Sequence, residues 1–305
     1  MKGESLLKYI TAVLFLIFGC IACSYQTEIL NKQEEELTDQ KESDSVTVKA
    51  GNIEYELHNT SITSKDQIKK LEKEIIEMTE LIQNTVQTNY NPSKKIHISL
   101  HNGPGVSTGF RSNIKLYFII EEKYPLVHEL SHTLLGYGEN FSAESGYFTQ
   151  EGFAVYMQTK YGKPSFPNYG ISEHNIMRYL IKSHRNIPLY KLIEDKSDDE
   201  LFRPLGTTPQ DYALVWLSYL HAGSFVKYVF ETYGNENFEK IYNKTNLANV
   251  IEENYGKSIE TLEKEWINYI LENETDLTTE DKMKIDDFYS IISSIKSIDD
   301  QVFKR

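Results

Sequence analysis

The sequence predicts an α+β fold in which a small mixed sheet with helices forms the N-terminal part and helices form most of the C-terminal part. Residues 46–57 and 95–100 alternate apolar and polar side chains with the period of two that is typical of strands. Further along the chain this alternation gives way to long helical runs, of which residues 209–233 are the longest. We therefore expect the sheet within about residues 46–137 and the helical part within about residues 138–275.

The remaining N-terminal elements follow from local patterns. Residues 64–87 carry apolar side chains at the three- and four-residue spacing of an amphipathic helix, and residues 113–120 have the composition of a strand. His97 in the strand at 95–100 and His101 just after it point to the same face. We expect His97 to fill that face of the sheet rather than to bind a metal ion.

The C-terminal helices differ in how much apolar surface they carry. Residues 209–233 contain few charged side chains, which indicates a helix that is buried nearly all round. Polar residues such as Ser218 and His221 interrupt this run, so we do not expect it to span a membrane. Shorter helices are predicted at residues 235–242, 247–255 and 258–271, with a helical extension at 276–305.

Composition limits the classes of partner. The chain has 305 residues, of which 40% are hydrophobic and 25% charged, which suits one globular unit. Its formal net charge of −13 argues against nucleic acid as a partner. The two cysteines both lie near the N-terminus, so the folded part has neither a disulfide bond nor a cysteine ligand for a metal.

The N-terminus has the pattern of a targeting segment. A basic start precedes an apolar run at residues 9–19, which is too short to span a bilayer as a helix. Cys20 follows a small residue in a pattern that resembles a bacterial lipobox, with Cys23 as the alternative lipidation site and an ordinary signal peptide as a further possibility. We expect a signal peptide at residues 1–23, a disordered acidic tether at 24–45 and a lipid anchor on the outer face of a bacterial membrane.

Residues 126–135 carry the chemistry around which the chain is organised. They contain His128-Glu129-Leu-Ser-His132, and on a helix two histidines four residues apart lie on one face, where both imidazoles can reach one metal ion. Glu129 can then face a water molecule at the metal without being a ligand.

The surroundings of this motif favour a metal site. Pro125 is expected at the first position of the helix, and Gly136 just past its end. A second helix, predicted at residues 149–158, carries Glu151 nineteen positions after His132. A tetrahedral zinc ion needs a third protein ligand and one open position for water, and this carboxylate can be that ligand.

The combined pattern, His128-Glu129-x-x-His132 with Glu151 inside Gln-Glu-Gly-Phe-Ala, resembles the gluzincin zinc peptidases, the peptidase MA-like group that includes the M1-type aminopeptidase core. Residues 219–234 are similar to the helix that follows the metal site in that group, and the likeness covers about residues 115–270. The resemblance implies a thermolysin-like arrangement with one Zn²⁺ ion in a cleft between the two parts. It also implies a peptide or protein substrate; no partner subunit is predicted, and we assume a monomer.

The resemblance implies further roles for single residues. Glu129 would be the general base, and a tyrosine on the helix at 209–233 would stabilise the oxyanion. Tyr219 matches this position best, with Tyr212 and His221 as alternatives. Some gluzincins carry an acidic residue one turn after the glutamate ligand, where this chain has Val155, so we consider Glu144 as a substitute.

Two more expectations concern the substrate. The family uses the strand before the metal helix, here residues 113–120, as the sheet edge that pairs with an extended peptide. This chain lacks the Gly-x-Met-Glu-Asn pattern that helps M1 aminopeptidases to bind a free amino terminus. We therefore expect an endopeptidase, with two alternatives: a non-catalytic metal-binding or structural lipoprotein, and a zinc hydrolase of a non-peptide amide or ester.

Overall fold

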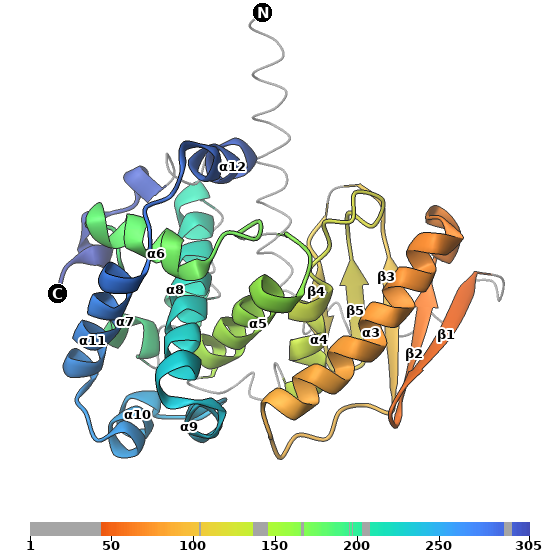
Figure 1. Ribbon diagram of the computed structural model, residues 1–305, viewed down its shortest axis with the longest axis horizontal. Coiled ribbons are helices and arrows are strands. Elements are labelled where there is room, and N and C mark those ends of the chain that lie inside the picture. The colour runs from red at the N-terminus through yellow and green to blue at the C-terminus, as the bar shows by residue number, and fades with distance from the viewer. Residues whose placement is uncertain are drawn as a thin grey trace, which may run out of the picture.

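The computed structural model describes residues 44–103, 105–136, 146–165, 168–194, 196, 198–202, 208–289 and 295–305 (Figure 1). The predicted signal peptide with Cys20 and Cys23, all but the last residues of the tether, and Glu144 lie outside these ranges. Within them, no helix is both long and apolar enough to cross a bilayer.

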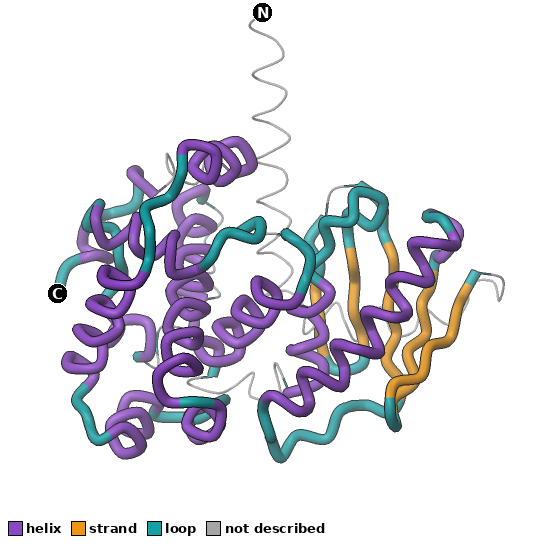
Figure 2. Tube along the Cα trace, in the orientation of Figure 1, coloured by secondary structure: helices purple, strands orange, loops and turns teal. Residues whose placement is uncertain are grey.

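The sheet is mixed, as the sequence predicts. Its five strands lie in the order β1-β2-β3-β5-β4, in which the central pairs β2/β3 and β3/β5 are parallel and the outer pairs are antiparallel. The strands are β1 (Ser45–Ala50), β2 (Ile53–His58), β3 (Lys95–Leu100), β4 (Thr108–Phe110) and β5 (Asn113–Leu116). All of them precede the motif helix, and the described chain after it is mainly helical (Figure 2).

The edge of the sheet differs from the prediction. The strand expected at residues 113–120 is β5, which ends at Leu116, before Phe118 adopts a φ of 60°. It is not an edge strand, because β3 and β4 flank it. The edge strand next to β5 is β4, whose three residues are too few to show the alternation from which strands are predicted.

One face of the sheet is apolar and the other polar. In β2 the side chains of Ile53, Tyr55 and Leu57 are buried, and those between them are partly exposed. Helix α3 (Lys65–Thr85) lies across the apolar face (Figure 1), where the Tyr55 hydroxyl contacts Thr79 Oγ1 at 2.8 Å. The sheet thus has the alternation of an antiparallel or mixed sheet that is covered on one side.

Helices α5 and α8 form the centre of the helical part and pack closely against each other. A Cβ atom added to Gly152 of α5 would lie 2.7 Å from the carbonyl oxygen of Ala222 in α8, so only glycine permits this approach. The predicted bounds of α8 are confirmed. The helices are α4 (Leu126–Leu135), α5 (Tyr147–Tyr161), α6 (Glu173–Lys182), α7 (Leu189–Ile193), α8 (Pro209–Tyr233), α9 (Asn235–Ile241), α10 (Leu247–Tyr255), α11 (Ile259–Asn273) and α12 (Thr279–Tyr289).

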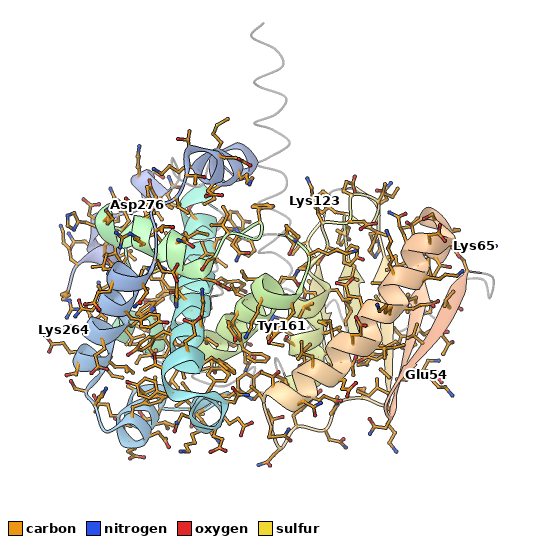
Figure 3. All side chains as sticks on the ribbon, in the orientation of Figure 1. Glu54, Lys65, Lys123, Tyr161, Lys264 and Asp276 are labelled. Atoms are coloured by element: carbon orange, nitrogen blue, oxygen red, sulfur yellow. The ribbon has the colours of Figure 1, made fainter. Side chains whose placement is uncertain are left out.

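The C-terminal segment packs back onto the helical part. Ser258 caps α11 by accepting a hydrogen bond from the backbone of Thr261, and Trp266 is buried. After α11, Asp276 accepts hydrogen bonds from Arg178 and Lys182 of α6 (Figure 3). These contacts hold the start of the C-terminal extension against the helices before it.

Candidate metal centre

The motif helix α4 is buried on all sides. Each of its ten residues is buried, because α3, β4 and α5 pack around it. Gly136 closes the helix with a φ of 95°, as predicted, whereas Pro125 is its N-cap and not its first helical residue. A Cβ atom on Gly109 of β4 would lie 2.3 Å from the carbonyl oxygen of Glu129, so β4 runs directly against the motif.

Three side chains converge at the predicted site. His128 Nε2 lies 3.0 Å from His132 Nε2, and these two atoms lie 3.3 and 3.4 Å from Glu151 Oε2. Helix α4 supplies both imidazoles one turn apart, and α5 supplies the carboxylate. The sequence prediction of these three residues as one cluster is therefore confirmed.

The distances fit a metal ion. Three ligand atoms about 2.0–2.1 Å from a tetrahedral zinc are about 3.3 Å apart, close to the separations found here. Two imidazoles and one carboxylate form a common ligand set for such an ion. The buried group of His128, His132 and Glu151 can therefore hold a metal ion.

The surroundings of Glu151 keep its carboxyl group ionised. Burial opposes ionisation of Glu151, but the charge and hydrogen bonds of His132 and His128 outweigh it and lower the pKa of Glu151 below its usual range. The carboxylate is thus negatively charged at neutral pH.

Glu129 has a different environment from Glu151. Burial raises the pKa of Glu129 to about 7, against the opposing charge of His128. The charge of Glu151 raises this pKa further, whereas a hydrogen bond from the Gly109 backbone lowers it. A carboxyl group of this kind can both accept and release a proton near neutral pH.

Tyr219 contacts the cluster. Its hydroxyl donates a hydrogen bond of 2.7 Å to Glu151 Oε1 and thereby leaves Oε2 to face the histidines. The ring lies 6.4 Å from that of His128 and packs against Phe202 and Trp216. Tyr219 is therefore the candidate from α8 that reaches the cluster.

The two alternatives to Tyr219 have other surroundings. His221 contacts the carbonyl oxygen of Leu217 through Nδ1 and accepts the backbone N–H of Ile187 at Nε2. Burial lowers its pKa to about 4, so it is a neutral structural residue. Tyr212 is buried about two turns nearer to the start of α8 than Tyr219.

Two residues near the cluster are not predicted from the sequence. Gln158 of α5 accepts the backbone N–H of His128 at 3.1 Å and donates to the carbonyl of Lys163, which fixes the start of the motif helix relative to α5. Burial, and then the charge of Glu151, raise the pKa of Tyr242, which keeps its hydroxyl protonated. No local pattern marks either residue, because each reaches the site through tertiary packing.

One turn after Glu151, where some gluzincins carry an acidic residue, this chain has an apolar side chain. Val155 is buried on α5 and packs against Gly223 of α8, where the two helices approach each other closely. A glycine on one helix and a compact side chain on the other suit a close approach better than a carboxylate would.

No family model and no curated protein matches this chain.

Proposed function

We propose that this chain is a zinc-dependent metallopeptidase of the gluzincin type that cuts peptide bonds within a chain. The observation that carries the proposal is the convergence of His128 Nε2, His132 Nε2 and Glu151 Oε2, with the buried carboxyl of Glu129 beside them. A site that only stores a metal ion has no need for Glu129. We propose that the substrate binds between the sheet and the helical part, next to Glu129.

In this proposal, His128, His132 and Glu151 hold Zn²⁺. When bound, zinc polarises the substrate carbonyl and lowers the pKa of water from about 16 to about 7. Glu129 accepts the proton of the attacking water and then delivers it to the departing amine.

The edge strand β4 supports a peptide substrate. Its outer side has no partner strand within the described sheet, and Gly109 brings its backbone directly against Glu129. An extended peptide that added to this edge would make backbone hydrogen bonds and bring its scissile bond toward Glu129. We therefore propose that β4, rather than β5, pairs with the extended peptide substrate.

We also propose that the protein is exported and anchored to the membrane by a lipid. The apolar run at residues 9–19 and the cysteines that follow it indicate export, with lipidation at Cys20, or alternatively at Cys23. The enzyme would act on peptides or proteins at the outer face of a bacterial membrane.

Cleavage of an unfolded protein by the purified chain tests the function. We expect internal cuts, which mass spectrometry of the products identifies, because the sequence lacks the M1 pattern for a free amino terminus. A chelator such as 1,10-phenanthroline should abolish the cleavage, and added zinc should restore it. No cleavage by the zinc-loaded chain would refute the peptidase proposal, and stepwise removal of N-terminal residues would show an aminopeptidase instead.

Replacing Tyr219 with phenylalanine is expected to lower turnover about 10- to 100-fold at saturating zinc. The variant keeps the ring packing but loses the hydroxyl that contacts Glu151. Initial rates of peptide cleavage measure the effect, and Tyr212→Phe on the same helix is the matched control. If Tyr212→Phe lowers turnover and Tyr219→Phe does not, the assignment of Tyr219 is wrong.

A further inference from the structure

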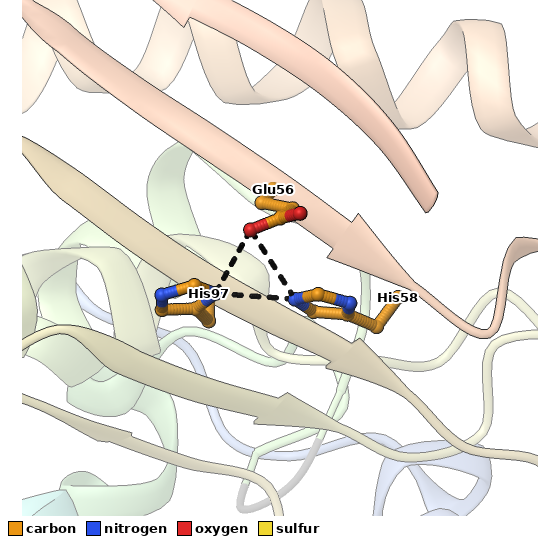
Figure 4. Close-up of side chains that lie close together, drawn as sticks. All are labelled: Glu56, His58 and His97. Atoms are coloured by element: carbon orange, nitrogen blue, oxygen red, sulfur yellow. Dashed lines mark hydrogen bonds and ion pairs between the residues drawn. The ribbon is translucent and has the colours of Figure 1, made fainter. Parts of the chain in front are cut away.

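We propose that Glu56, His58 and His97 form a second binding site for a divalent transition-metal ion, on the polar face of the sheet (Figure 4). The residues belong to β2 and β3, whereas the buried cluster belongs to α4 and α5. The inference is independent of the peptidase proposal.

Strand geometry brings the three side chains together. Glu56 and His58 are two residues apart on β2, so their side chains point to the same face. The parallel pairing of β2 and β3 places His97 directly beside Glu56. The two imidazole rings stack with their centres 5.4 Å apart and their planes at 20°.

The polar atoms of this cluster have the spacing of metal ligands. His58 Nε2 lies 3.1 Å from His97 Nδ1, and Glu56 Oε2 lies 3.2 Å from His97 Nδ1 and 3.8 Å from His58 Nε2. These separations scatter around the distance of about 3.3 Å between ligands of a tetrahedral ion. Side-chain exposures of 23% for Glu56, 34% for His58 and 40% for His97 leave the outer position to water.

A lysine competes for the same carboxylate. Lys95 Nζ lies 2.8 Å from Glu56 Oε2 and 3.9 Å from Glu54 Oε1. An ion that binds to Glu56 therefore has to displace the ammonium group, which can remain near Glu54. We expect this competition, together with the exposure of the site, to make binding weaker than at the buried cluster.

The ligand types determine which ions fit. Imidazole and carboxylate groups suit Zn²⁺, Ni²⁺ and Cu²⁺, and among these Cu²⁺ binds most tightly to a site of given ligands. The cluster should therefore bind Cu²⁺ more tightly than Zn²⁺.

Equilibrium dialysis with zinc tests the second site by comparison of variants. His58→Gln and His97→Gln are each expected to bind one zinc ion fewer per chain than the wild type. The matched control is His184→Gln, which removes an exposed histidine outside the cluster and should bind as much zinc as the wild type. The expected difference of one ion holds even if the buried cluster binds nothing, so a failure of the proposed function does not affect it. Equal zinc binding by the wild type and both cluster variants would overturn the proposal.

Two further measurements do not depend on a loss of binding. Lys95→Gln removes the competing charge and is expected to tighten zinc binding about threefold. With Cu²⁺, paramagnetic resonance in Glu151→Gln should show two imidazole nitrogens, and additional substitution of His97 should leave one. Unchanged or weaker zinc binding by Lys95→Gln, or a copper spectrum unaffected by the loss of His97, would contradict the site.

Discussion

Replacing Glu129 with glutamine is expected to lower peptide turnover by about 10²- to 10⁴-fold, without loss of metal. The amide has nearly the same shape as the carboxyl and can stay in the buried position beside Gly109. It cannot accept a proton, and it is not part of the ligand triangle of His128, His132 and Glu151. Rates of cleavage at saturating zinc, together with metal content, measure the two effects separately.

The control for this variant is another buried glutamate. Glu263 of α11 is 2% exposed and accepts a hydrogen bond from Arg305, away from the metal cluster. Glu263→Gln should therefore retain wild-type turnover. If Glu129→Gln retains both its metal and full turnover, Glu129 is not the general base.

Replacing Glu151 with glutamine is expected to remove nearly all metal from the buried cluster. The substitution takes away the only negative charge among the three converging ligands and replaces Oε2 with a poorer ligand atom. Metal per chain after dialysis against a weak chelator measures the loss. The measurement is made in a His97→Gln background, so that the surface cluster of Glu56, His58 and His97 does not contribute. Peptide turnover should vanish with the metal.

Glu263→Gln is again the matched variant and should keep its metal. Circular dichroism shows whether each variant is folded. A folded Glu151→Gln chain with wild-type metal content would remove Glu151 from the ligand set.

Local sequence patterns predict the elements that carry the site. The apolar period and the glycine at its end indicate α4, and the bounds of α8 follow from a long run with few charged residues that begins at a proline. The ligand set is predictable because two histidines four residues apart on a helix necessarily share a face. Only Glu151, on another helix, needs the additional guidance of the resemblance to gluzincins.

The order of the strands in the sheet cannot be predicted from local sequence patterns. Whether β5 is an interior or an edge strand depends on the pairing of β4, whose three residues carry no periodic signal. The same holds for the contact of Tyr219 with Glu151, which depends on the register of α8 against α5. A sequence limits such contacts to a few candidates, and the packing selects among them.

The surface cluster of Glu56, His58 and His97 likewise cannot be predicted from local sequence patterns. His97 alone has the pattern of a residue that fills a sheet face, and Glu56 and His58 lie about forty residues earlier in the chain. Only the parallel pairing of β2 and β3 brings the three together.

A crystal of the zinc-loaded protein, measured at the zinc absorption edge, tests the central claim most directly. We expect an anomalous difference peak about 2.0–2.2 Å from His128 Nε2, His132 Nε2 and Glu151 Oε2. The absence of a peak among these three atoms, in a crystal grown with excess zinc, would contradict the metal centre on which the proposed function rests.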